Sequence, residues 1–135
     1  TPLHLAASKG DAQAIHLLIR SGADLEARTT SKGATPLYYA SRYNHLPVVQ
    51  ALVSAGADVH ACDSDGVQAI HGASICATAN TSSVISTLLK HGADIHSRAH
   101  DGGSAIHFVL SRGTKEALSF LLKHGADTNS RRKNG

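Results

Sequence analysis

The chain has 135 residues, of which 41% are hydrophobic and 17% are charged, with a formal net charge of +3 at pH 7. This length suits one domain with a modest core, and the mild charge does not by itself indicate binding to nucleic acid or to a membrane surface. No apolar stretch approaches the roughly 20 residues of a membrane-spanning helix, and two cysteines are too few for a disulfide framework. We therefore expect an intracellular protein, cytoplasmic or nuclear.

Two short motifs recur along the chain in a fixed register. The tripeptide Gly-Ala-Asp begins at Gly22, Gly56, Gly92 and Gly125, at intervals of 34, 36 and 33 residues. Two linked motifs that keep their register over four copies indicate a repeat protein. The second motif precedes each tripeptide and reads Thr1-Pro2-Leu3-His4, Thr35-Pro36-Leu37-Tyr38, Gln68-Ala69-Ile70-His71 and Ser104-Ala105-Ile106-His107.

Each unit predicts two helices. A Thr at the start of the motif is a helix N-cap, and the Pro that follows it suits the first helical position. Gly or Asn then ends the short first helix in a left-handed turn, and apolar residues at helical spacing indicate a second helix that ends at the Gly of the tripeptide. For each predicted pair, the cap of the first helix, the turn between the helices and the end of the second helix are, in chain order, Thr1, Gly10 and Gly22; Thr35, Asn44 and Gly56; Gln68, Asn80 and Gly92; and Ser104, Gly113 and Gly125.

About a dozen residues connect each helix pair to the next, through turn-forming pairs such as Asp65-Gly66. A unit of helix, turn, helix and finger resembles the ankyrin repeat, whose period is 33 residues and whose signature includes Thr-Pro-Leu-His. The resemblance implies an all-α ankyrin-repeat solenoid of stacked antiparallel helix pairs with projecting β-hairpin-like fingers. Its repeats are approximately residues 1–33, 34–66, 67–102 and 103–135, in one domain of residues 1–135.

Neither end of the repeat array carries a polar capping repeat, which the stacked architecture needs for solubility. The sequence opens within a motif, at Thr1, and stops where a further repeat begins. We therefore expect a fragment of a longer ankyrin-repeat protein, monomeric in solution.

Repeat three departs most from the pattern. Gln68 replaces the Thr cap, which costs about 0.5–2 kcal/mol unless its side chain finds another bond. Gly72 lies within the first helix, where it costs about 1 kcal/mol relative to Ala. Three extra residues fall between the helices, within residues 75–79. We therefore expect repeat three to be the softest part of the array. In repeat two, Tyr38 takes the place of the signature histidine.

The resemblance implies that a partner binds along the concave side, which is made of the finger tips and the outer face of the first helices. Tyr and Arg are the residues most enriched at binding hot spots. Taken singly, each of these side chains is better explained as a solvated surface residue, because only a minority of interface residues contribute strongly to binding, so the prediction is a collective one. The candidates are first Arg42, Tyr43, Arg98, His100 and Arg112, and then Arg28, Lys32, Asp65 and Ile75.

Because most of these candidates are basic, we interpret the chain as a protein–protein interaction module whose partner is an acidic protein or peptide. One alternative is a nucleic-acid surface, because Arg28, Arg98 and Arg131 share one finger position and form a basic row. Interleaved aspartates and the scarcity of stacking aromatics weigh against it. A second alternative is a targeting domain of a larger enzyme.

Histidines are abundant, but their positions favour a structural role. His4, His71 and His107 share the signature position, where we expect the imidazole to bond the capping residue and nearby backbone. His60, Cys62 and His96 are potential zinc ligands, but stacked fingers are expected to place the two histidines about 10 Å apart, and paired Cys-x₂-Cys spacing is missing. We predict no metal, no cofactor and no catalytic site in this chain.

Overall fold

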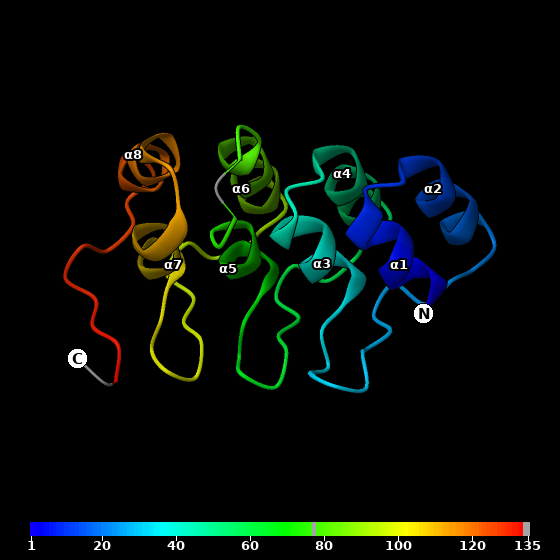
Figure 1. Ribbon diagram of the computed structural model, residues 1–135, viewed down its shortest axis with the longest axis horizontal. Coiled ribbons are helices and arrows are strands. Elements are labelled where there is room, and N and C mark those ends of the chain that lie inside the picture. Colours follow the sequence, from blue (N-terminus) through cyan, green and yellow to red (C-terminus); the bar gives the residue numbers. More distant parts are fainter. Residues whose placement is uncertain (77, 134–135) are drawn as a thin grey trace.

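Four helix pairs lie side by side in a row in this computed structural model, which describes residues 1–76 and 78–133 (Figure 1). The first helices form one layer, the second helices form the other, and the connecting loops project beyond the first layer. Within the described residues there are no strands, so the predicted all-α class is confirmed. The helices are α1 (Pro2–Lys9), α2 (Ala12–Arg20), α3 (Pro36–Arg42), α4 (Leu46–Ser54), α5 (Ala69–Ala73), α6 (Thr81–Lys90), α7 (Ala105–Arg112) and α8 (Lys115–Lys123).

The helix ends follow the predicted capping pattern at most positions. The Thr1 hydroxyl accepts the His4 N–H, and Pro2 occupies the first turn of α1. The glycine of every tripeptide lies in the left-handed region, with φ between 81° at Gly22 and 97° at Gly56. A residue with a side chain is strained there, which explains why the second helices end at glycine.

Two of the four predicted left-handed turns between helices are wrong. Gly10 and Asn44 adopt positive φ angles of 74° and 55°, as expected. Asn80 instead has a right-handed conformation (φ −87°) and directly precedes α6. Gly113 is extended (φ −85°, ψ 176°), because the next residue, Thr114, is the N-cap of α8 and accepts the Ala117 N–H at 3.1 Å.

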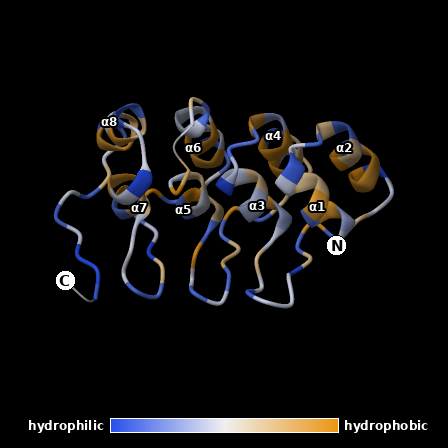
Figure 2. Ribbon diagram, viewed as in Figure 1, coloured by the Kyte–Doolittle hydropathy of each residue, from blue (hydrophilic) through white to orange (hydrophobic). Residues whose placement is uncertain are grey.

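The core is a continuous aliphatic layer between the two rows of helices. Each first helix packs against the first helices on either side, as α3 does against α1 and α5, and α4 packs against α2 and α6 in the same way. Figure 2 shows the apolar residues gathered on the helices, whereas much of the loop surface is polar. Neighbouring units therefore bury each other's apolar faces. The largest fully buried aliphatic residues of this core are Leu3, Ile15, Leu37, Leu52, Ile70, Ile85, Leu88 and Leu121.

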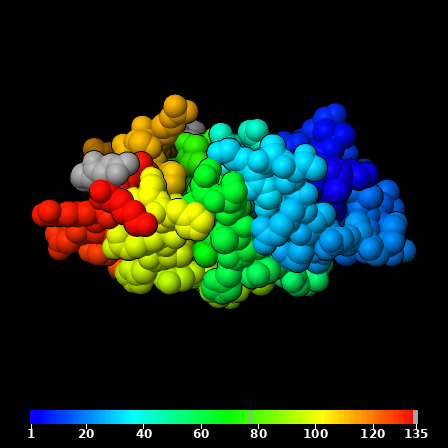
Figure 3. Space-filling view, turned by 90° about the horizontal axis from the view of Figure 1, so that it is seen from below, coloured from blue at the N-terminus to red at the C-terminus, as the bar shows by residue number. Residues whose placement is uncertain are grey.

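Hydrogen bonds between neighbouring loops hold the fingers together. The N–H groups of Ser64, His100 and Lys133 each donate to a carbonyl of the preceding finger, at Lys32, Asp65 and Asp101, with distances of 2.8–2.9 Å. Seen from the finger side, the four units lie directly beside one another in chain order (Figure 3). The hairpin-like character is weaker than expected, because the described fingers contain one isolated β-bridge, between Cys62 and Gln68.

The signature histidines have the structural role predicted for them. In each case Nδ1 meets the cap: it lies 2.8 Å from the Thr1 hydroxyl, 3.0 Å from the Gln68 nitrogen and 2.9 Å from the Ser104 hydroxyl. Since Nδ1 accepts the Gln68 N–H, the ring proton of His71 is assigned to Nε2. The Nε2 atoms of His4, His71 and His107 meet the carbonyl oxygens of Ala34, Ser97 and Ser130 at 2.9–3.0 Å, so each ring ties its helix to the following finger.

Tyr38 and Gly72 are two departures from the repeat pattern that explain each other. A Cβ atom on Gly72 would lie 3.1 Å from the Tyr38 ring, so the glycine leaves room for the larger side chain of the preceding repeat. The Tyr38 hydroxyl in turn accepts a hydrogen bond from Arg42 Nη1 at 3.0 Å. The glycine that weakens α5 therefore accommodates the aromatic residue that replaces a histidine.

This pairing predicts strong coupling between the two positions. We expect Gly72→Ala to be neutral or destabilising in the natural chain, because crowding against Tyr38 offsets the helix propensity that Ala adds. In a Tyr38→His background the same change should stabilise by about 1 kcal/mol. Urea unfolding of the four members of this double-mutant cycle measures the coupling, and additive effects would contradict the pairing.

Repeat three retains the weak features that the sequence indicated. Its first helix, α5, has only five residues, and the Gln68 amide oxygen is buried without a hydrogen-bond partner among the described residues. Of its inserted segment, residue 77 lies outside the described residues. We expect α5 amides to exchange with deuterium faster than those of α3, and equal protection in a hydrogen-exchange experiment would contradict this.

Candidate functional site

Four of the predicted partner-binding residues occupy equivalent places at the ends of the first helices. Arg42 and Ile75 lie seven residues after their helix caps, and Tyr43 and Arg112 lie eight residues after theirs. Tyr43 follows α3 with 45% of its surface exposed, and Arg112 is an exposed residue at the end of α7. Ile75 is half-buried after α5. Tyr43 and Arg112 are therefore the two most accessible side chains of this set.

Arg42 is partly engaged within its own repeat. It is half-buried and donates to the Tyr38 hydroxyl, and this bond holds the pKa of the guanidinium above its ordinary value. A planar guanidinium carries five N–H donors, so one bond to Tyr38 leaves several directions for a partner. Arg42 thus combines a positioning contact with capacity for a carboxylate.

The finger arginines hold adjacent loops together. Arg28 Nη1 donates to Gly33 O at 2.9 Å in its own finger and to Cys62 O at 2.6 Å in the next one. Arg98 repeats this arrangement, with Gly102 O at 3.3 Å and Arg131 O at 3.4 Å. Part of the hydrogen-bonding capacity of both side chains is therefore used inside the scaffold, which the sequence pattern did not reveal.

Lys32 and Asp65 form an ion pair between neighbouring finger tips. Lys32 Nζ lies 2.7 Å from Asp65 Oδ2, with both side chains exposed. The hydrogen bond and the opposite charge lower the pKa of Asp65 and raise that of Lys32, so both groups stay charged near neutral pH. The pair presents a dipole with no net charge to a partner.

His100 is an exposed residue whose position depends on a glycine. Gly66 has a φ of 75°, and a Cβ atom placed on it would meet His100 Cδ2 at 2.6 Å. The His100 N–H donates to Asp65 O at 2.9 Å. The imidazole therefore lies against the preceding finger, at Gly66, while the residue as a whole remains exposed.

Phe108 was missed by sequence reasoning as a member of this surface. Its half-buried ring has the guanidinium of Arg132 at 5.0 Å from its centroid and the ring of His71 at 5.5 Å. An arginine over an aromatic face is a favourable cation–π contact. Phe108 lies four residues after its cap, the position that Tyr39 and the exposed Leu5 hold in other repeats, and this shared position was the signal that could have revealed it.

Positive charge is concentrated in the last repeat. Residues 103–135 contain six Lys or Arg residues and two Asp or Glu residues. Residues 1–102 contain seven Lys or Arg residues and eight Asp or Glu residues. Three of the six, Arg131, Arg132 and Lys133, belong to the last loop, and Arg112 ends α7. The electrostatic field of the chain is therefore asymmetric, with its basic end at the C-terminal repeat.

The residues weighed as metal ligands do not form a cluster. Across residues 1–76 and 78–133, no group of three His, Cys, Asp or Glu side chains is arranged to hold a metal ion.

Within the same residues, no helix is both long enough and apolar enough to span a bilayer.

Comparisons with known proteins agree with the repeat architecture. Family models described as ankyrin repeats match residues 1–63 and residues 75–122, which together make up more than half of the chain. The B-cell lymphoma 3 protein homolog of Mus musculus is 40% identical over 74 residues, which are 55% of this chain and 16% of that protein.

Two further relatives show similar coverage. The probable E3 ubiquitin-protein ligase XBOS32 of Oryza sativa subsp. japonica is 38% identical over 76 residues, 56% of this chain and 15% of the relative. The ankyrin repeat and SOCS box protein 6 of Mus musculus is 38% identical over 71 residues, 52% of this chain and 17% of the relative. The chain thus spans less than a fifth of each relative. On the strength of both family models and of its four stacked helix pairs, the chain belongs to the ankyrin repeat family, whose repeats are generally protein–protein interaction modules.

Proposed function

We propose that this chain binds an acidic protein segment on the surface formed by the ends of the first helices and the fingers, toward its C-terminal repeat. The four basic residues at the end of α7 and in the last loop, Arg112, Arg131, Arg132 and Lys133, carry this proposal. Tyr43 and Arg112 supply exposed aromatic and guanidinium groups, which are the side chains most enriched at hot spots. His100 and the free donors of Arg42 extend the same surface.

The contacts of the finger arginines favour a protein partner over nucleic acid. A row of arginines that follows phosphates needs guanidinium groups directed at solvent. Arg28 and Arg98 instead donate to backbone carbonyls of the fingers. Asp65 pairs with Lys32, and Asp127 lies 3.7 Å from Arg98 Nη2, so carboxylates neutralise part of the row.

A quantitative capture experiment tests the proposal. The immobilised chain and its Tyr43→Ala/Arg112→Ala variant are exposed to the same cell extract, and the bound proteins are compared by mass spectrometry. Gln13→Ala/His16→Ala, on the exposed side of α2, is the matched control. We expect the surface variant to capture about tenfold less of the acidic partner than the natural chain, or less still, since hot-spot residues contribute about 2 kcal/mol or more each.

The control should retain the partner. Identical bound proteins for the natural chain and the surface variant would contradict the proposal. Stronger capture of DNA or RNA than of protein, with an affinity that falls steeply with salt concentration, would favour the nucleic-acid alternative.

A further inference from the structure

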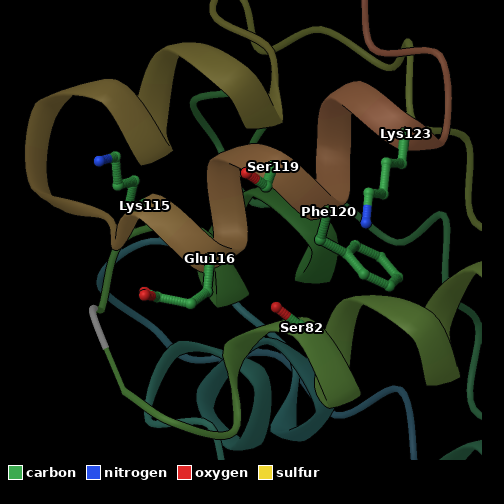
Figure 4. Close-up of a pocket in the computed structure, with 6 residues that line it drawn as sticks. All are labelled: Ser82, Lys115, Glu116, Ser119, Phe120 and Lys123. Atoms are coloured by element: carbon green, nitrogen blue, oxygen red, sulfur yellow. The ribbon is translucent and has the colours of Figure 1, made fainter.

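A groove runs across the second-helix layer, on the side of the molecule away from the fingers. Between α6 and α8 it is lined by Ser82, Lys115, Glu116, Ser119, Phe120 and Lys123 (Figure 4). An adjoining hollow shares Ser82 and Phe120 and extends past Ser86 and Lys90 to Leu46 of α4. The two hollows adjoin at Ser82 and Phe120, and we refer to them together as the second-helix groove, which is lined by residues of α4, α6 and α8.

Phe120 lies at the junction of the two hollows. Its half-buried ring stacks against the His124 ring, with centroids 4.1 Å apart and planes inclined by 26°. In Figure 4, Phe120 and Lys123 extend from α8 toward α6, and the Ser82 side chain extends from α6 toward α8. A ring fixed in this way offers an apolar contact area at low cost in side-chain entropy.

Hydroxyl groups line the α6 side of the groove. α6 begins Thr81-Ser82-Ser83 and continues with Ser86 and Thr87, a composition with low intrinsic helix propensity. Ser82, Ser86 and Thr87 are half-buried along the groove, and the Thr87 hydroxyl donates to Ser83 O at 2.9 Å. Serine hydroxyls both donate and accept, so this wall suits the polar backbone and carboxylates of a bound segment.

Three lysines surround the groove, against one carboxylate. Lys90, Lys115 and Lys123 are exposed, and Glu116 is the single acidic side chain among the lining residues. The corresponding hollow between α2 and α4 is lined by residues 16, 19, 47, 50, 51, 54 and 55, and it contains no Lys, Arg, Asp or Glu. Of these hollows in the second-helix layer, only those that involve α6 and α8 are lined by lysines.

We propose that the second-helix groove is a second docking surface, which takes an acidic protein segment with an apolar anchor side chain between its carboxylates. The anchor contacts Phe120 and Leu46, and the carboxylates pair with Lys90, Lys115 and Lys123. Charge complementarity selects the occupant. Nucleic acid is disfavoured because the groove offers one aromatic ring for base stacking and places Glu116 beside the phosphates. A partner held here leaves the finger surface free.

An NMR titration of the ¹⁵N-labelled chain tests this docking surface. The probe is a short synthetic amphipathic peptide with glutamates on both sides of a central leucine, compared with the same peptide carrying lysines and with a single-stranded oligothymidine. We expect the acidic peptide to shift the amides of α6 and α8, around Ser82, Ser86, Ser119 and Phe120. Shifts confined to the fingers and first helices would overturn the proposal while supporting the finger surface, so the two proposals fail separately.

Charge-reversal variants give the matched comparison. The Lys115→Glu/Lys123→Glu variant is expected to bind the acidic peptide with an affinity about tenfold or more lower than that of the natural chain. Arg20→Glu reverses a charge at an exposed position of α2 in the first repeat, away from both proposed surfaces, and should leave the affinity unchanged. Equal weakening by both variants, equal binding of the lysine peptide, or tighter binding of the oligothymidine at this groove would overturn the proposal, as would no binding at all.

Discussion

Replacing Leu52 with alanine is expected to lower the free energy of unfolding by about 2–5 kcal/mol, the usual range for a buried leucine. Leu52 lies on α4 with 0% of its surface exposed, and α4 packs against α2, α3 and α6. The truncation removes apolar contacts and leaves a cavity that these helices fill only partly. Equilibrium unfolding in urea, followed by circular dichroism, measures the loss.

Leu17→Ala is the matched control for this prediction. Leu17 lies on α2, a second helix like α4, but 63% of its surface is exposed. Its truncation is expected to change the free energy of unfolding by no more than about 0.5 kcal/mol, since substitutions at exposed positions have small effects. Equal losses for the two variants would mean that neighbouring units do not bury Leu52 between them.

The second large effect concerns His71, which is buried between repeat three and the following finger. His71→Ala removes the acceptor of the Gln68 N–H and the donor to Ser97 O. Each buried group left without a partner costs about 1–3 kcal/mol, in addition to the cavity. We expect this variant to be among the least stable single substitutions, and urea unfolding at neutral pH measures it.

The same residue predicts how stability depends on pH. Burial lowers the pKa of His71 below its ordinary value of 6.5, although the bond to Ser97 and the nearby Asp101 and Asp63 oppose this shift. Below about pH 6.5 the unfolded chain therefore binds a proton that the folded chain resists. This contribution to stability is present above pH 6.5 and is lost as the pH falls toward the folded-state pKa.

His71→Gln separates this effect from the titration of the other histidines. Urea midpoints of the natural chain and of this variant are compared at neutral and mildly acidic pH. The natural chain is expected to lose more stability on acidification because it alone contains His71. The other histidines titrate in both proteins, so their contributions cancel in the comparison. Parallel losses would show that His71 does not set the pH dependence.

Much of the fold was predictable because the repeat signals are local. A Thr-Pro pair specifies a helix start within its own turn, as at Thr35, and a glycine such as Gly92 specifies a left-handed helix end. Asn80 and Gly113 show the limit of this approach. Both residues tolerate left-handed geometry, but the three extra residues in repeat three and the cap at Thr114 set different connections.

The contacts of the candidate site were less predictable because they cross from one repeat to the next. Arg28 reads as a free surface cation until its bond to Cys62 O, 34 residues away, is seen. Gly72 reads as a defect of α5 until the Tyr38 ring is seen beside it. Aligning the repeats identifies equivalent positions, but it does not show which side chain of one unit fills a space left in the next.

Site-specific photocrosslinking tests the central claim, that stacked repeats present the finger and first-helix surface to a protein partner. A benzophenone amino acid replaces Tyr43 in one variant and Ser54, at the end of α4, in the other. The acidic partner captured by the natural chain is irradiated with each variant, and the adducts are identified by mass spectrometry. We expect adducts from position 43 and none from position 54, whereas adducts from position 54 alone would contradict the claim.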